Sequence, residues 1–75
     1  MDEQVPIEVK RAILENSRAV WRNTAYEATI AFKIAKRIDD AGLMASAQAS
    51  IARAEKMISG YDAELEALLN GQVTE

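Results

Sequence analysis

The sequence predicts an all-α protein, an antiparallel hairpin of two helices, and three observations support this fold class. Eight residues in the second half recur at alternating spacings of three and four, the period of a helix stripe that faces another helix. Only one proline and three glycines occur in 75 residues, and alanine, a strong helix former, is abundant. No segment shows the alternation of a strand. The stripe, here called the second-helix seam, comprises Met44, Ala47, Ile51, Ala54, Ile58, Tyr61, Leu65 and Leu68.

A single domain is expected over residues 6–70, and it begins with a helix over about residues 6–40. Pro6 suits the first helical position, because the N–H that proline lacks would have no partner there. Glu8 follows in the first turn, where a negative charge is favourable. Gly42 is expected to adopt the left-handed conformation that commonly ends a helix.

The second helix is expected after a turn at about residues 40–43, and to span about residues 43–70. Gly71 follows its last apolar residues, which is a signature of a helix C-terminus. Residues 1–5 are expected to form a flexible arm and residues 71–75 a flexible tail.

A turn this short makes the two helices antiparallel neighbours, so the second-helix seam must face a matching stripe on the first helix. If the chain folds back at residues 40–42, the numbers of facing residues add to about 83. That register pairs Ala28 with Ala54 and Trp21 with Tyr61. The first helix is expected to contribute to this core Leu14, Trp21, Ala28, Phe32 and Ala35.

A second apolar stripe lies beside the first on the same helix, displaced by about 100°. Together the two stripes cover more of the helix than one neighbour can shield, and a two-helix hairpin buries little surface against an ordering cost of about 1.5 kcal/mol per residue. We therefore expect a homodimer, a four-helix bundle of two hairpins; the alternatives are another protein on this stripe or a loose apolar edge. The expected dimer-interface residues are Val9, Ile13, Val20, Glu27, Ala31, Ile34 and Ile38.

Glu27 interrupts this second stripe, and Asn16 and Asn23 lie at its margin. One interpretation places the carboxylate at the rim of the interface, where it reaches water or an arginine. The other is that Glu27 sets the register between partners at some cost in stability, as buried polar residues do in coiled coils.

Small residues cover the back of the second helix. They are consistent with a solvated surface made of good helix formers, and alternatively they let another helix approach closely in a larger assembly. This surface comprises Ala45, Ala49, Ala52, Gly60, Ala63 and Ala67, flanked by Arg53 and Lys56.

The net charge of −3 is unevenly distributed. Residues 10–37 contain seven basic and two acidic side chains, whereas the second helix contains two basic and four acidic ones. Most of the basic residues share the face of the first helix that is opposite the apolar arc formed by the two stripes. Such a face is either simply solvated or binds an acidic protein or phosphates. The candidate partner-binding residues are Arg11, Arg18, Arg22, Tyr26, Lys33, Lys36 and Arg37.

The residue types argue against an enzyme. There is no cysteine and no histidine, so thiol chemistry, the commonest general base and the commonest transition-metal ligand are all missing. No serine lies in a recognisable nucleophile motif. We therefore expect no catalytic residue, no metal and no cofactor. The first residues do not resemble a signal peptide, and no apolar run approaches the ~20 residues of a membrane span, so a cytoplasmic protein without membrane contact is expected.

These observations favour a non-enzymatic regulator or adaptor, a homodimer that docks a helical face onto another protein. Trp21 or Phe32, where incompletely buried, and the basic residues would supply the contacts, because aromatic residues and arginine are enriched at binding hot spots. The alternatives are an RNA- or DNA-binding dimer that uses the basic side, and a structural subunit of a helical assembly.

Overall fold

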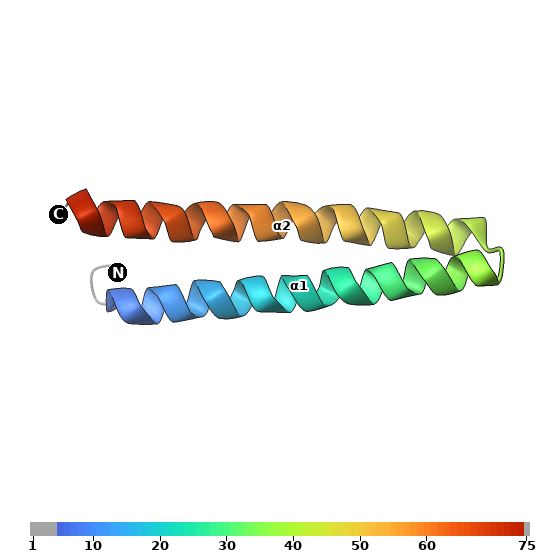
Figure 1. Ribbon diagram of the computed structural model, residues 1–75, viewed down its shortest axis with the longest axis horizontal. Helices are drawn as coiled ribbons and strands as arrows, with labels where there is room; N and C mark the ends of the chain where they lie inside the picture. The colour runs from blue at the N-terminus through green and yellow to red at the C-terminus, as the bar shows by residue number, and fades with distance from the viewer. Residues whose placement is uncertain (1–4, 75) are drawn as a thin grey trace.

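The chain folds into two α-helices that pack side by side as an antiparallel hairpin (Figure 1). The structure, a computed structural model, describes the backbone of residues 5–74 and the side chains of residues 5–71. Helix α1 spans Ile7–Arg37 and helix α2 spans Ala41–Thr74. The hairpin is 54 Å long and 17 Å across in both other directions. The predicted all-α hairpin is confirmed, and no strand occurs within residues 5–74.

The turn lies at residues 38–40, so the predicted turn at residues 40–43 is wrong. Asp39, and not Gly42, has the left-handed backbone, with a φ of 60°. Its N–H donates to the carbonyl of Lys36 at 3.2 Å, and the Asp40 N–H donates to the carbonyl of Ala35 at 2.9 Å. These two bonds form a Schellman motif that ends α1 at Arg37, three residues before the expected end.

Asp40 begins the second helix immediately afterwards. Its side-chain Oδ1 accepts a hydrogen bond from the N–H of Leu43 at 3.0 Å, and its carbonyl accepts one from the N–H of Met44 at 3.0 Å. This is the geometry of an N-cap, which satisfies a backbone donor that the first turn leaves free. Gly42 is therefore an ordinary helical residue, because the cap starts α2 at Ala41 rather than near residue 43.

The outer ends of the helices also differ from the expected bounds. Pro6 precedes α1 instead of starting it, and its carbonyl accepts the Lys10 N–H at 3.1 Å. Gly71 does not end α2, because the backbone remains helical through Thr74. The expected tail is thus helical up to that residue. Residue 75 and residues 1–4 of the expected arm lie outside the described part of the chain.

Small residues form the most deeply buried part of the core. The buried apolar residues are Ala28, Ala35, Ala47, Ala54 and Leu65. All other residues of the second-helix seam are half-buried, as are Leu14, Trp21 and Phe32 on α1. Among the described residues no large side chain is fully buried. The hairpin therefore has a continuous but thin core.

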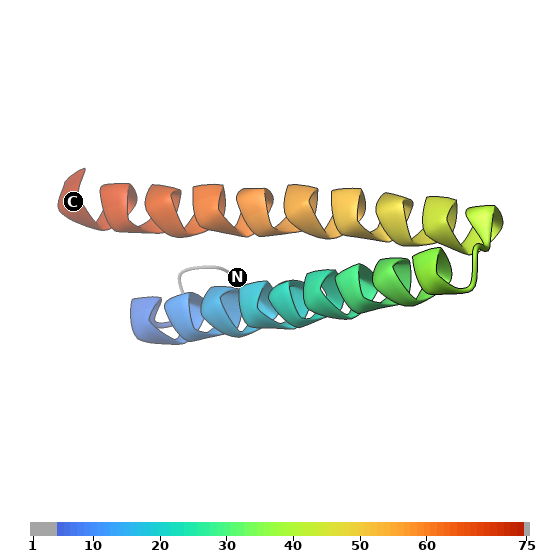
Figure 2. The same cartoon turned by 45° about the vertical axis from the view of Figure 1, so that its right-hand side comes forward.

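The helices lie closest near the turn and farther apart at the open end, in both views of the ribbon (Figures 1 and 2). Alanines face each other near the turn, and a methyl group allows close approach of two helices. Leu14, Trp21 and Leu68 occupy the open half of the seam, where larger side chains hold the helices apart. The size of the seam residues thus accounts for the spread.

The register differs slightly from the expected one because the turn comes earlier. The ion pair between Arg18 and Asp62 joins residues whose numbers add to 80, where about 83 was expected. By that register Ala28 lies two residues, about half a helical turn, from the level of Ala54, and both alanines are buried in the core. Ala28 also lines the same groove as Ser50.

The turn geometry predicts the effect of replacing Gly42 by alanine. Gly42 is helical, and a Cβ there meets only the Asp40 Oδ1 at 3.5 Å, an ordinary contact. Gly42→Ala should raise the free energy of unfolding by about 0.5–1 kcal/mol, because alanine restricts the unfolded chain. Urea unfolding followed by circular dichroism, at one protein concentration, measures this change. A decrease of about that size in the free energy of unfolding would instead indicate that Gly42 is the left-handed residue. Asp39→Gly is the variant expected to relieve backbone strain, because Asp39 has the left-handed backbone.

Candidate functional site

One long side of the hairpin exposes the residues expected at a dimer interface. Four aliphatic side chains of α1 and that of Ile38, directly after the helix, are each about half exposed, and Glu27 and Ala31 between them are exposed as well. Leu43 and Met57 of α2, which were not among the expected interface residues, are exposed to 52% and 37%. We call this the apolar side of the hairpin. Its aliphatic residues are Val9, Ile13, Val20 and Ile34 on α1, together with Ile38 directly after the helix.

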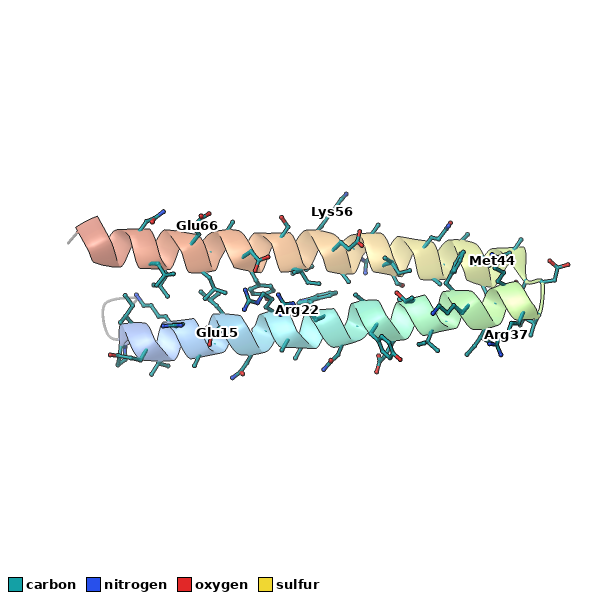
Figure 3. All side chains as sticks on the ribbon, viewed as in Figure 1. Glu15, Arg22, Arg37, Met44, Lys56 and Glu66 are labelled. Carbon is teal, nitrogen blue, oxygen red and sulfur yellow. The ribbon has the colours of Figure 1, made fainter. Side chains whose placement is uncertain are left out.

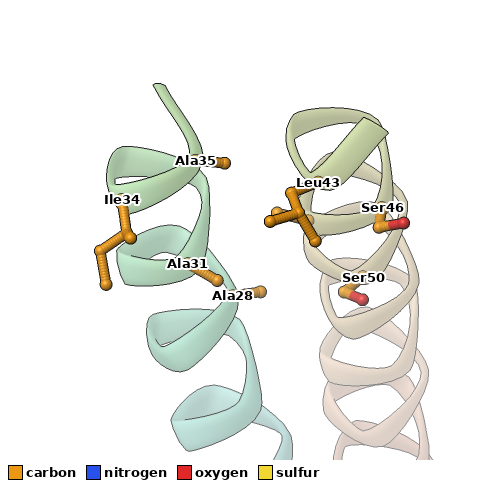
Figure 4. A pocket seen from close by; sticks show the side chains of 8 residues that line it. Ala28, Ala31, Ile34, Ala35, Leu43, Ser46 and Ser50 are labelled. Atoms are coloured by element: carbon orange, nitrogen blue, oxygen red, sulfur yellow. The ribbon is translucent and has the colours of Figure 1, made fainter. Parts of the chain in front are cut away.

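A groove of about 350 Å³ runs between the helices on the apolar side, near the turn (Figure 4). Alanines of α1 point toward α2 in this groove, and Ser46 and Ser50 lie on the α2 side. None of the lining side chains carries a charge or an acid–base group. The lining residues are Ala28, Ala31, Ile34, Ala35, Leu43, Ser46, Ala47 and Ser50.

A second groove lies near the open end of the hairpin, and Ile13 places it on the same side. Leu14 and Leu68 contribute apolar surface, while Lys10 and Glu64 contribute polar atoms. The apolar side is thus hollowed between the helices at both ends. Surfaces of this shape accept the side chains of another helix more readily than a compact ligand.

The opposite side of the hairpin carries the basic residues and an acidic stripe beside them. Arg18 Nη1 lies 2.6 Å from Asp62 Oδ1, and these two side chains are 25% and 51% exposed. Residues four or seven apart share one face of a helix. Arg11 and Arg22 therefore flank Arg18 on α1, just as Glu55 and Glu66 flank Asp62 on α2. We call this the charged side.

The predicted partner-binding residues divide into two groups. Arg18 is held by Asp62, and Arg11 is held by Glu15, with Nε 3.1 Å from Oε2. Arg22, Lys33, Lys36 and Arg37 form no ion pair among the described side chains, and all four are exposed. In Figure 3, Arg37 lies on the side of α1 away from α2, while Lys56 extends from the far side of α2.

Tyr26 is the most exposed of the large apolar or aromatic side chains described, at 67%. It lies four residues from Arg22 and seven from Lys33, so the three share one face of α1. Trp21 and Phe32 lie on the face that meets α2, where both are half-buried. Of the aromatic residues, Tyr26 is therefore the one best placed to contact a partner. With Arg22, Lys33 and Arg37 it forms what we call the cationic face of α1.

No family model matches this chain, and neither a curated protein nor a solved structure shows significant similarity. Within the described residues, no three acidic side chains gather as metal ligands would, and neither helix has a stretch long and apolar enough to cross a membrane. Function is therefore inferred from the apolar side, the charged side and the cationic face of α1.

The ion pair on the charged side predicts a small coupling between its members. Because both side chains reach solvent, a double-mutant cycle of Arg18→Ala and Asp62→Ala should give a coupling free energy of about 0.5–1 kcal/mol that falls as salt is added. Urea unfolding of the four proteins measures it. Arg22→Ala combined with Asp62→Ala is the matched control, and it should show weaker coupling. Equal coupling in both cycles would contradict the specific pairing.

Proposed function

We propose that this chain is a non-enzymatic adaptor or regulator that works as a homodimer of helical hairpins and docks a helical face onto another protein. The observation that carries the proposal is the area the hairpin leaves in water. Its accessible surface is 5808 Å². A folded monomer of 8.3 kDa is expected to expose about 4,600 Å². The hairpin thus exposes about 1,200 Å² more than a compact monomer of its mass.

The excess area is of the size that a stable dimer buries. A standard interface removes about 800 Å² from each partner, and permanent homodimers remove more. The apolar side supplies aliphatic surface for such contact from Val9 near the open end to Ile38 near the turn, interrupted by Glu27. A second copy would also cover the half-buried residues of the thin core. Packing apolar side to apolar side gives a four-helix bundle with a common core.

Dimerisation through the apolar side leaves the cationic face of α1 free. Tyr26 there offers an exposed aromatic ring among Arg22, Lys33 and Arg37. Tyrosine and arginine are enriched at protein-binding hot spots, and three unpaired cations favour an acidic partner. Nucleic acid fits less well, because a phosphate backbone that contacts the charged side would also meet Glu55, Asp62 and Glu66. An acidic surface of another protein is therefore the partner we propose.

Val20→Glu tests the dimer. Val20 is 61% exposed on the apolar side, so a charge there is tolerated by the single hairpin but would be buried between two. Sedimentation equilibrium over a range of concentrations should show a dimer for the natural sequence and a shift to monomer for Val20→Glu. Ala19→Glu is the matched control, since Ala19 is the adjacent exposed residue outside the apolar side, and it should remain dimeric. A natural sequence that stays monomeric and melts cooperatively at high micromolar concentration would refute the dimer.

Arg22→Glu tests the cationic face. A labelled helical peptide of glutamate and leucine and a labelled RNA hairpin serve as probes in fluorescence anisotropy. The peptide should bind, and Arg22→Glu should weaken this binding about tenfold by replacing attraction with repulsion. Lys56→Glu makes the same charge change on the far side of α2 and should have little effect. RNA binding that weakens steeply with added salt, without peptide binding, would favour the nucleic-acid alternative instead.

A further inference from the structure

We infer that the two hairpins of the dimer lie with their turns at the same end, so that α1 of each packs on α2 of the other and Glu27 pairs with the partner's Arg53. This inference rests on the proposed dimer and specifies its geometry. It assigns a role to the one acidic residue of the apolar stripe, which has no ion-pair partner among the described side chains of its own hairpin.

Glu27 and Arg53 both lie on the apolar side. Ala31, four residues after Glu27, lines the groove near the turn from α1. Ser50 and Ser46, three and seven residues before Arg53, line the same groove from α2. Residues at these spacings share a helix face, so both charged side chains border the surface that a second copy would cover. Both residues are exposed in the single hairpin.

Glu27 and Arg53 also lie at the same height along the hairpin. Their numbers add to 80, as do those of Arg18 and Asp62, whose side chains meet across the two helices. Yet Glu27 and Arg53 form no ion pair within the chain. Each is thus a single charge of opposite sign at one level of the same surface, available to a partner.

The position of the two-fold axis decides whether these charges meet. With the axis parallel to the helices, every residue keeps its height, and α1 lies over the partner's α2. Glu27 then faces the partner's Arg53, and the contact occurs twice by symmetry. With the axis perpendicular to the helices, α1 lies over the partner's α1 and heights are reversed. Glu27 would then face an apolar stretch or the partner's own Glu27, and both arrangements bury an unpaired carboxylate.

In the arrangement with the axis parallel to the helices, the other residues of the apolar stripe also face residues of the partner's α2 at the same height. Counted by the register that pairs Glu27 with Arg53, each aliphatic residue of α1 lies at the height of a small residue on α2. Large side chains facing small ones allow two helices to interlock. The facing pairs are Ile13 with Ala67, Val20 with Gly60, and Ile34 with Ser46. Ala67 and Ser46 line the two grooves of the apolar side.

A spin label near the turn distinguishes the two arrangements. The chain contains no cysteine, so Ala41→Cys introduces a single labelling site at the exposed start of α2. With turns at the same end, pulsed dipolar spectroscopy on the dimer should give a distance below about 30 Å, because helices in a bundle pack about 8–10 Å apart. With turns at opposite ends, the labels would be separated by a distance near the 54 Å length of the hairpin.

Charge reversal tests the contact itself. Glu27→Arg and Arg53→Glu should each raise the dimer Kd about tenfold or more, and the double variant should return it close to the natural value. Lys36→Glu, which makes the same charge change on the face of α1 opposite the apolar stripe, should leave Kd unchanged and serves as the control. Sedimentation equilibrium measures the Kd of the natural sequence and of the four variants.

The possible outcomes separate this inference from the proposed function. A dimer with a label distance near 54 Å, or a double variant that stays as weak as the single ones, overturns the parallel arrangement but leaves the dimer standing. Absence of a dimer in the natural sequence overturns the proposed function, and the inference with it. A short label distance together with recovery in the double variant supports both.

Discussion

Two helices shield only one stripe of each other from water, and this limit governs the whole molecule. The seam of α2 faces α1 along its entire length, yet the residues buried most deeply are mainly alanines. Trp21, Phe32 and Ile58 each keep part of their surface in solvent because no third layer covers them. A core of this kind is long and thin, and its large side chains still have apolar area to bury. The excess of accessible surface follows from that geometry.

The two long sides of the hairpin differ in whether their side chains find neighbours within the single chain. On the charged side, basic residues of α1 lie beside acidic residues of α2, and the pair of Arg18 with Asp62 links the helices directly. On that side a direct ion pair between the two helices thus forms within the single chain. On the apolar side, aliphatic residues of α1 have no neighbour on their outer flank. This asymmetry supports the proposal that a second copy covers the apolar side and that another protein binds the cationic face of α1.

The turn shows how local chemistry competes within a few residues. Gly42 carries the strongest general preference for the left-handed position, and on that basis the helix was expected to end near it. Asp39 takes the left-handed conformation instead, since Asp40 can then cap α2 through the N–H of Leu43. Asp39 thus ends α1, and the adjacent Asp40 starts α2. The intrinsic preference of each residue does not decide between Gly42 and Asp39 as the left-handed residue. The stabilisation from the Asp40 cap appears only when the end of α1 and the start of α2 are considered together.

The amino-acid sequence by itself determined the all-α hairpin and the residues of its seam, because helical periodicity is a local property and Met44 through Leu68 repeat it without interruption. It also indicated that a single neighbouring helix cannot cover the second apolar stripe of the first helix. Only the tertiary structure decided the register, since this depends on where the turn forms. The register brings Arg18 next to Asp62, and it thereby determines which basic residues are paired and which are free. Pairing between distant residues is set by the geometry of the whole hairpin, which no local pattern encodes.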